Sequence, residues 1–412
     1  GVATGKPFYF ENVVEELDSP GEYYIDRKKD ELLFWPSSNE GDAYLSWSDK
    51  YLLRIVGGTD VTVEGLHFET SRTTPVEVAG GTGNTLRSCV FRNLGQYGVK
   101  VSGGTYDRIV QCRFLDMGAG GVELYGGDRK TLTPANDVVE DCLFERFSRL
   151  SRTYRPGVSV NGVGMTVSHC EFRDAPHSAI FFNGNDHLFV GNVFRNVVNS
   201  TGDAGAIYAG RDWTKRGTVI RDNLFDNING LHLYENGVYL DDQLSGITIE
   251  HNAFVNCWLG MMVGGGRDNF VHENLFVRCH IAMHLDARGL GWAKGGFDGL
   301  KASLESVPYK SDVWKNRYPG IERILDDDPM APKGNIVAGN ALLGAGKDTD
   351  SMEAAFHRDS QVEGNFSESG DWDVSVRGNT LVLGPRAKAQ LPPALQRLDG
   401  TKYGPRFSIP DP

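Results

Sequence analysis

Apolar and polar residues alternate in short segments that recur along most of the chain. Each segment of a first family, such as VTVEG or ITIEH, leads into a phrase that ends in phenylalanine, such as CVF or NLF. Alternation with period two predicts strands that turn one face to a core. The shortest intervals between these phenylalanines are 22 or 23 residues, and the longer ones contain an inserted loop. The phenylalanines are Phe68, Phe91, Phe114, Phe144, Phe172, Phe194, Phe225, Phe254 and Phe276.

A second family of alternating segments lies between these phrases. It includes GVKVS, AIYAG, GVYLD and AMHLD, in which the second and fourth residues are apolar and the third and fifth vary. A coil of about 22 residues with short strands and irregular turns is typical of a solenoid. We therefore predict an all-β fold, a right-handed parallel β-helix in which equivalent residues stack at about 4.8 Å.

The residue two positions before each phenylalanine forms a column of its own. A buried Asn can hydrogen-bond the turn backbone and its stacked neighbours, and a buried Cys fills the same space as a small apolar group. We expect all six cysteines to be reduced core residues, since Cys257 and Cys279 also share one repeat position. The column reads Cys89, Cys112, Cys142, Cys170, Asn192, Asn223, Asn252 and Asn274, followed by Asn340, Asn365 and Asn379.

The repeat divides the chain into three parts. Residues 1–50 do not fit it and are expected to form a β-rich N-terminal subdomain that caps the first coil, because an uncapped coil would expose strand edges. Residues 51–390 are the predicted β-helix, with weak coils to about residue 384. Residues 286–334 break the register and predict short helices in a long loop beside a cleft. Residues 391–412 are a Pro-rich C-terminal tail.

The varying positions of the second segment family should face outward. Polar and aromatic residues concentrate there between Phe181 and Asp286. Asp241 and Asp286 are two coils apart, so their backbones should lie roughly 9 to 10 Å apart, near the range for an acid and a base flanking a water. Asp203 could instead approach Asp241 from a turn. The candidate catalytic residues are Asp203, Asp241, Asp242 and Asp286.

Other residues of the same region are candidates for substrate binding. Three arginines follow the outward strand and could form a column that pairs with the acids. A histidine could relay a proton or simply lie on the surface. Two tryptophans could stack on sugar rings or pack within loops. The candidates are Tyr208, Arg211, Trp213, Tyr239, Arg267, His284, Arg288 and Trp292.

Composition limits the partners. A net charge of −12 disfavours nucleic acid and anionic membranes, and no apolar run approaches the length of a membrane span. The acidic run at residues 326–328 is better explained as a solvated loop than as a calcium site. No phosphate loop, zinc motif or nucleophile elbow is found, so no metal and no cofactor are expected. The chain starts with Gly and nothing in it resembles a signal peptide, which indicates a mature or trimmed form. We expect a secreted or periplasmic protein.

Several motifs resemble one family of carbohydrate-active enzymes. They are FENVVEELDSPGEYYIDRKKDELLFWP, GDAGAIYAGRDW, YLDDQLSG, GGGRDN and HLDARGLGW. Together they are similar to the β-helix glycoside hydrolases of family 141, which has α-L-fucosidase and xylanase members, and the similarity spans most of residues 8–345. The resemblance implies catalysis by two aspartates, which match Asp203 and either Asp241 or Asp242.

Three functions remain open at the level of sequence. The first is a glycoside hydrolase that acts on a cell-wall glycan, with one Asp as general acid and another as base or nucleophile. The second is a polysaccharide lyase, which would need a cation or Arg to neutralise a uronate and a Lys or Arg as base. The third is a glycan-binding β-helix without activity. The fold alone does not choose among them.

Overall fold

The computed structural model describes residues 10–38, 43–350 and 354–407. The chain divides into two units, Gly1–Ser46 and Trp47–Pro412. In the first unit, the described residues form the 3-10 helix η1 (Val14–Glu16) and an antiparallel hairpin of β1 (Tyr23–Asp26) and β2 (Glu31–Phe34). The capping role expected for this part of the chain stays a prediction.

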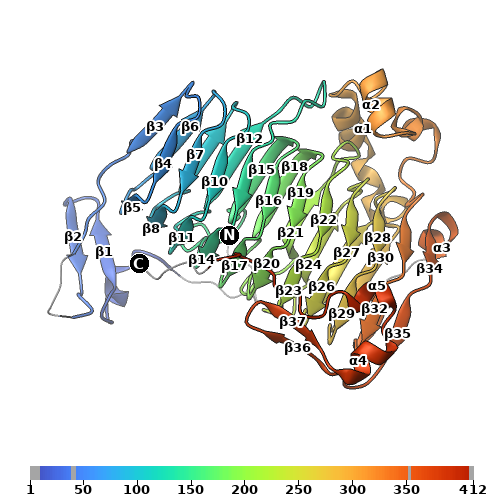
Figure 1. Cartoon of the computed structure of the whole chain (residues 1–412). Helices are drawn as coiled ribbons and strands as arrows, with labels where there is room; N and C mark the ends of the chain where they lie inside the picture. The colour runs from blue at the N-terminus through green and yellow to red at the C-terminus, as the bar shows by residue number, and fades with distance from the viewer. Residues whose placement is uncertain (1–9, 39–42, 351–353, 408–412) are drawn as a thin grey trace. The chain divides into compact units, whose positions relative to one another are not determined.

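The second unit is built on three parallel sheets of eleven strands each (Figure 1). Successive strands along the chain belong to different sheets, and each strand pairs with the strand one coil away. The first sheet contains β3 (Leu53–Val56), β6 (Val76–Ala79), β9 (Val99–Ser102), β12 (Val122–Gly126), β15 (Val158–Val163), β18 (Ile180–Asn185), β21 (Ala204–Gly210), β24 (Glu235–Asp241), β27 (Leu259–Gly264), β30 (Ile281–Asp286) and β33 (Lys347–Asp350).

The other two sheets close the coil. The second sheet contains β4 (Thr62–Glu64), β7 (Thr85–Arg87), β10 (Arg108–Val110), β13 (Val138–Glu140), β16 (Thr166–Ser168), β19 (Leu188–Val190), β22 (Val219–Arg221), β25 (Thr248–Glu250), β28 (Phe270–His272), β31 (Ile336–Ala338) and β34 (Gln361–Glu363). The third sheet contains β5 (His67–Glu69), β8 (Val90–Arg92), β11 (Arg113–Leu115), β14 (Leu143–Glu145), β17 (Glu171–Arg173), β20 (Val193–Arg195), β23 (Leu224–Asp226), β26 (Ala253–Val255), β29 (Leu275–Val277), β32 (Ala341–Leu343) and β35 (Phe366–Glu368). The predicted parallel β-helix is confirmed.

The phenylalanine column forms a continuous stack inside the coil. Neighbouring rings lie nearly parallel, with centroids 5.0 Å apart at Phe68 and Phe91 and 4.7 Å apart at Phe254 and Phe276. All nine rings are buried. Because equivalent residues stack at the strand spacing, each coil contributes one phenylalanine at the same position, and together these rings fill the core along the stack.

The column of Cys and Asn is also confirmed over most of its length. Asn223 donates from its backbone N and from Nδ2 to Oδ1 of Asn252, at 3.0 and 2.9 Å, and its own Oδ1 accepts the same pair of bonds from Asn192. In the cysteine part, the backbone N of Cys112 lies 3.4 Å from Sγ of Cys142. All six cysteines are free and buried. The column thus satisfies buried turn amides rather than forming disulfides.

The turn just before this column has one backbone conformation in every coil. A residue with positive φ stands between each strand of the second sheet and the next strand of the third, for example Ser88 (φ 52°), His169 (φ 52°) and Gly339 (φ 67°). Residues other than Gly rarely adopt this conformation. The stacked Asn side chains and the strands on both sides hold the turn in place.

The break in register at residues 286–334 contains helices, as predicted. They are η2 (Arg288–Leu290), η3 (Trp292–Gly296), α1 (Phe297–Glu305), α2 (Asp312–Arg317) and η4 (Ile321–Asp326). Their apolar faces form a separate small core that includes Leu304, Trp314 and Ile321. In Figure 1, α1 and α2 lie together against one side of the stack of coils.

The C-terminal region differs from the predicted weak coils. After β35 the chain forms an antiparallel hairpin of β36 (Val374–Arg377) and β37 (Thr380–Leu383), then α4 (Pro385–Gln390) and α5 (Pro393–Gln396). A further helix, α3 (Ala354–Asp359), places Phe356 in the main core. The hairpin and helices pack their apolar side chains on the outer face of the third sheet.

Asn379 therefore does not belong to the stacked column. It lies in the turn of the hairpin and donates from Nδ2 to Oε2 of Glu171, 2.9 Å away. The chain then returns along the coils, where Arg406 pairs with Glu140 and Asp141. The hairpin alternates like a coil strand, so its sequence pattern does not reveal that it pairs with itself.

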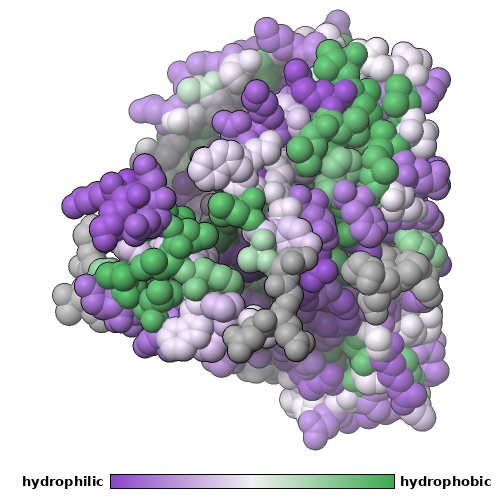
Figure 2. Space-filling view, turned by 90° about the vertical axis from the view of Figure 1, so that its left-hand side faces the viewer, coloured by the Kyte–Doolittle hydropathy of each residue, from purple (hydrophilic) through white to green (hydrophobic). Residues whose placement is uncertain are grey.

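The first coil of the stack carries several apolar side chains that its own unit does not bury. Leu52, Val56 and Leu66 of the first coil are 53%, 66% and 48% exposed. Figure 2 shows that apolar residues gather in patches among polar ones on the surface of the molecule. A β-helix end exposes both strand edges and core side chains, which is the physical basis of the predicted cap.

Candidate active site

The outward face of the first sheet has the alignment that the repeat predicts. Tyr208 pairs in register with Tyr239, and Tyr239 with Met262. Met262 pairs in turn with His284. In the neighbouring column Gly210 pairs with Asp241, and Gly264 with Asp286. The strands therefore bring residues far apart in sequence onto one surface, with a glycine on the coil next to each of these two aspartates.

A cavity of about 370 Å³ opens on this face. It contains four carboxyl groups and two guanidinium groups, and aromatic side chains close its sides. The lining residues are Asp203, Arg211, Tyr234, Tyr239, Asp241, Asp242, Met262, His284, Asp286, Arg288 and Trp292.

Asp241 is the buried acid of the cavity. It is 5% exposed, and its Oδ2 accepts a hydrogen bond from the hydroxyl of Tyr208 at 2.8 Å. Its Oδ1 accepts from the backbone N of Asp242 at 2.8 Å and from Nη1 of Arg288 at 3.2 Å. Burial and the neighbouring Asp242 raise the pKa of Asp241, despite the bonds that favour its ionised form.

Asp242 points to the arginines. Its Oδ2 lies 3.1 Å from Nε of Arg211, and its Oδ1 lies 2.9 Å from Nη1 of Arg288. Both arginines also approach Asp241, at 3.7 and 3.2 Å, so the two aspartates differ in that Asp241 is more deeply buried and accepts a bond from the Tyr208 hydroxyl, whereas Asp242 makes the shorter contacts with the arginines. The arginines offset the repulsion between the two carboxyl groups at the end of β24.

Asp286 is held as an ion. Its Oδ2 lies 2.9 Å from Nε2 of His284 and 2.9 Å from Nε of Arg288, and its Oδ1 accepts from the backbone N of Arg288 at 3.1 Å. Burial works to raise the pKa of Asp286, but the hydrogen bonds from His284 and Arg288 outweigh it and the pKa is lowered. Asp286 therefore fixes the orientation of Arg288 within the lining of the cavity.

Arg288 joins three of the four acids. It is 6% exposed, and it bonds Asp241, Asp242 and Asp286. Its guanidinium carbon also lies 5.3 Å from the ring centroid of Trp292, a cation–π distance. A planar guanidinium with five donors can bridge several carboxylates in fixed directions, which an ammonium group cannot do.

Asp203 is the exposed acid of the cavity. It lies just before β21 with a left-handed φ of 50°, and its Oδ1 accepts a hydrogen bond from the hydroxyl of Tyr239 at 3.0 Å. The rings of Tyr208 and Tyr239 pack edge to face with centroids 5.3 Å apart. Two packed tyrosines on neighbouring coils therefore each hold one aspartate, Tyr208 the buried Asp241 and Tyr239 the exposed Asp203.

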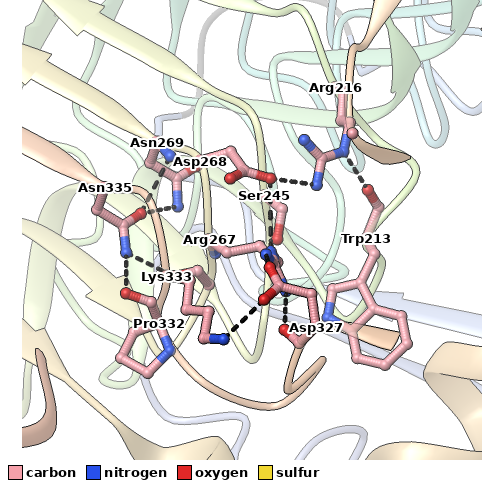
Figure 3. A network of polar contacts seen from close by, with 12 residues as sticks. Trp213, Arg216, Ser245, Arg267, Asp268, Asn269, Asp327, Pro332, Lys333 and Asn335 are labelled. Carbon is pink, nitrogen blue, oxygen red and sulfur yellow. Dashed lines mark hydrogen bonds and ion pairs between the residues drawn. The ribbon is translucent and has the colours of Figure 1, made fainter. Parts of the chain in front are cut away.

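Three predicted binding residues are not part of the cavity lining. Tyr208 only bonds the lining residue Asp241, whereas Trp213 and Arg267 turn away from the cavity. Trp213 is fully buried and packs against the helical insertion, and its Nε1 donates to Oε1 of Gln243 at 3.4 Å. Arg267 turns to the insertion, where its Nη2 lies 2.5 Å from Oδ2 of Asp327 (Figure 3). The assignments of Trp213 and Arg267 are corrected. The helical insertion packs on the turns that follow the strands of the first sheet. It therefore contacts Trp213 and Arg267, the side chains that the sequence suggested for binding a ligand.

The same network accounts for the acidic run at residues 326–328. Asp327 also pairs with Nζ of Lys333 at 2.7 Å, and Asp328 pairs with the same amine at 2.8 Å. Ser245 Oγ accepts from the backbone N of Arg267 at 3.1 Å in this network (Figure 3). The run anchors the end of the insertion to the coils through ion pairs.

Two lining residues were not among the predicted site residues. Tyr234, 48% exposed, lies in the loop before β24. Oε1 of Glu235 accepts from the backbone N of Leu231 and of Leu233, at 2.7 and 3.0 Å, and so shapes this loop. Met262 stands in the predicted outward column but lacks a polar group that would have marked it. The repeat predicts which strand residues align in a column, but it does not predict the conformation of a loop between strands, such as the loop that carries Tyr234.

The best geometry for a metal ion lies elsewhere. Among the described residues, His251, His272 and Glu273 bring ligand atoms within 4.8 Å of one another. They lie at the second sheet, where His251 pairs with Glu273 and His272 with Glu250. The cavity on the first sheet has its acids paired with arginines and hydroxyls instead.

The sequence matches the family described as the right-handed β-helix region over residues 41–148 and 156–294. The chain belongs to this family, and the predicted handedness of the coil is confirmed. No curated protein matches the sequence. No helix among the described residues is long and apolar enough to cross a membrane.

Three solved structures illustrate what shares this fold. A glycoside hydrolase is 16% identical with a TM-score of 0.44, over 64% of this chain and 57% of that one, so the chain spans little more than half its length. PfbA, a surface adhesin of Streptococcus pneumoniae, is 11% identical with a TM-score of 0.41, over 59% and 68%. A mannuronic acid specific family 6 polysaccharide lyase from human gut microbiota is 12% identical with a TM-score of 0.43, over 85% and 67%. At these identities the likeness concerns the fold alone.

Proposed function

We propose that the protein is a glycoside hydrolase that acts on a fucoside- or xylan-type cell-wall glycan, with Asp203 and Asp241 as the catalytic pair. One observation carries the proposal. A buried carboxyl group whose pKa is raised and an exposed carboxylate line one cavity, each held by its own tyrosine. Two carboxyl groups in contrasting surroundings are what a glycosidase needs for its acid and its base.

Asp241 is assigned as the general acid. Its Oδ1 already accepts from a backbone amide and from Arg288, so the proton of the neutral acid belongs on Oδ2, beside the hydroxyl of Tyr208. This proton passes to the glycosidic oxygen as the bond from that oxygen to the anomeric carbon breaks. Burial keeps the carboxyl group protonated at a higher pH than an exposed aspartate.

Asp203 is assigned as the base. A water molecule attacks the anomeric carbon, and its proton passes to the Asp203 carboxylate while the leaving sugar keeps the proton from Asp241. The hydroxyl of Tyr239 orients this carboxylate from the neighbouring coil. The first anomer released, followed by proton NMR, decides between direct attack by water and a route through a sugar ester of Asp203.

The frame of Asp242, Asp286 and Arg288 positions this pair. Arg288 neutralises part of the negative charge beside Asp241, and Asp286 fixes the orientation of Arg288. A preorganised charged frame costs no rearrangement during the reaction, so its contribution is retained in the transition state.

The cavity is less suited to a lyase acting on a uronate. Its four aspartates and two arginines leave an excess of negative charge, which repels a carboxylate sugar. Tyr239 is a poor base because burial and the nearby Asp241 raise its pKa. Lys100 stands in the same outward column, but five coils away, which is roughly 24 Å at the strand spacing.

The test measures two products on a panel of nitrophenyl glycosides and soluble cell-wall polysaccharides. A hydrolase releases reducing ends without unsaturated sugar, whereas a lyase releases a product that absorbs in the ultraviolet. Asp203→Asn and Asp241→Asn should each lower turnover by about 10²- to 10⁴-fold, the usual contribution of a general acid or base. Asp298→Asn, at an exposed carboxyl of α1, is the matched control. Near-full activity of both variants on a confirmed substrate would remove the assignment.

A further inference from the structure

A second and larger cavity opens on the same face of the first sheet. It has a volume of about 530 Å³. Glu123, which lies in the same outward column as Tyr239, forms part of its lining. The lining residues are Asp49, Arg72, Thr73, Thr74, Gln96, Tyr97, Glu123 and Arg155. This mixture of guanidinium, carboxylate, hydroxyl and amide groups beside an aromatic ring suits the hydroxyl-rich edge of a sugar.

The two arginines of this cavity are available to a ligand. Among the described residues, neither Arg72 nor Arg155 forms an ion pair with a carboxylate, whereas Arg211 and Arg288 in the first cavity are both paired. Arg155 contacts the hydroxyl of Tyr97, and Tyr97 is 6% exposed.

A row of aromatic rings connects the two cavities. Tyr154 precedes Arg155 in the chain, and its ring centroid lies 5.9 Å from that of Phe181. Phe181 lies 5.1 Å from Tyr208, and Tyr208 lies 5.3 Å from Tyr239 in the first cavity. Tyr154 is 63% exposed. The pyranose faces of a sugar chain can pack on Tyr154 and on the partly exposed Phe181 and Tyr208, whereas Tyr239 is 4% exposed.

The loop that presents Tyr154 and Arg155 is fastened at both sides. The hydroxyl of Ser148 donates to the backbone carbonyl of Arg155. Arg152 donates from Nη2 to Oγ of Ser200 at 2.7 Å, which joins this loop to a loop of a later coil. An exposed tyrosine on a fastened loop loses little conformational entropy on binding.

The separation of the cavities fits a chain of several sugars. Glu123 and Tyr239 are four strand pairings apart, which is roughly 19 Å at the strand spacing. A single monosaccharide cannot contact both cavities over this distance. A chain laid along the outward column can contact both.

We infer that the cavity at Arg72, Tyr97 and Arg155, together with Tyr154 and Phe181, is a distal binding site for the same glycan chain whose reacting bond lies at Asp241. The inference rests on the proposed function and adds that the substrate is an oligosaccharide or polymer. The chain is an uncharged glycan, since the first cavity carries excess negative charge and the second balances two arginines against Asp49 and Glu123.

The test uses the full chain with Asp241→Asn, which prevents cleavage, in native gels that contain soluble arabinoxylan or fucosylated xyloglucan. Migration of this variant should be retarded by one of the polymers. Adding Tyr154→Ala to the Asp241→Asn variant should weaken binding about tenfold, the upper range for loss of one aromatic contact. Adding Arg155→Ala instead should also weaken binding, because it removes a guanidinium donor from the cavity. Tyr106→Ala, which removes a 59% exposed tyrosine before β10, should change nothing. Arg72→Ala provides an independent variant, and thermal melting confirms that each variant is folded.

A second readout separates this inference from the proposed function. In an otherwise intact enzyme, Tyr154→Ala should lower kcat/KM on the polymer and leave a nitrophenyl monosaccharide unaffected. The inference is overturned if Tyr154→Ala, Arg155→Ala and Arg72→Ala bind as tightly as Tyr106→Ala, or if neither polymer retards the parent. If the polymer is bound through Tyr154 while Asp203→Asn and Asp241→Asn cleave normally, the distal site stands and the catalytic assignment fails.

Discussion

The hydroxyl of Tyr208 lies 2.8 Å from Oδ2 of Asp241, although the two residues are 33 positions apart in the chain. They occupy neighbouring coils, since Tyr208 pairs with Tyr239 and Gly210 with Asp241. The bond orients Oδ2, the oxygen to which the proposed function assigns the proton of the acid. It also favours the ionised form of Asp241, against the effects of burial and of Asp242.

Tyr208→Phe should therefore shift the alkaline limb of the activity profile. Removing the hydroxyl removes an interaction that lowers the pKa of Asp241, so that pKa rises further. A general acid works only while protonated, so activity should persist to a higher pH than in the unaltered enzyme. The dependence of kcat/KM on pH measures the shift, and a limb displaced to lower pH would contradict the role of Asp241 as acid.

Asp242→Asn should have the opposite effect on the same limb. The Asp242 carboxylate raises the pKa of Asp241, so neutralising it should move the alkaline limb to lower pH. The variant also weakens the ion pairs with Arg211 and Arg288, and the free energy of unfolding should fall by about 1–3 kcal/mol. Urea denaturation beside the pH profile separates the two effects. The Tyr208→Phe variant is the natural comparison because its limb moves the other way.

Arg288→Met should be the most destabilising change at the site. It leaves the buried Asp286 and Asp241 without their shared cation, and removal of one partner of a buried ion pair costs about 3–5 kcal/mol. The denaturation midpoint and the slope together measure this loss. A Lys at this position should recover little, because an ammonium group cannot reproduce the bonds from Nε and Nη1.

The ion pair of Asp286 and Arg288 also predicts how stability depends on pH. The folded-state pKa of Asp286 is lowered below its unfolded value of about 3.9, so its contribution is fully present above that value. The contribution is lost as the pH falls through the folded-state pKa. Thermal melting between about pH 5 and pH 2 should therefore fall more steeply for the unaltered protein than for Asp286→Asn. Equal slopes would show that Asp286 is not held as an ion.

The stacked asparagines predict a large effect at a site far from the cavity. Asn223→Ala leaves the backbone N and Nδ2 of the buried Asn192 without their acceptor, and it removes the bonds to Asn252. Each buried polar group left unsatisfied costs about 1–3 kcal/mol. Asn229→Ala, at an exposed loop residue that does not have a positive φ, is the control. Comparable losses in urea for the two variants would mean that the column is not what holds the turns.

Much of the fold follows from the sequence because its determinants are local and periodic. Alternation with period two places Val238 and Leu240 inside and Tyr239 and Asp241 outside without knowledge of the remaining chain. Repetition then aligns Tyr239 with Tyr208 and Met262, because stacked coils must keep their buried phenylalanines in register. The positions of Asp241 and Asp286 on one face are therefore determined by the sequence itself.

The tertiary structure decided what the repeat does not encode. Trp213 and Arg267 follow outward strands as Arg211 does, yet the helical insertion covers them and leaves Arg211 exposed. Which turn side chains remain free depends on which segment packs over them, and that segment lies 60 residues away in the case of Arg267 and Asp327. The division of roles between Asp241 and Asp242 has the same origin. Two adjacent carboxyl groups are equivalent in sequence, and only the placement of Tyr208, Arg211 and Arg288 around them makes their surroundings differ: Asp241 is buried beside the Tyr208 hydroxyl with a raised pKa, and Asp242 bonds both arginines.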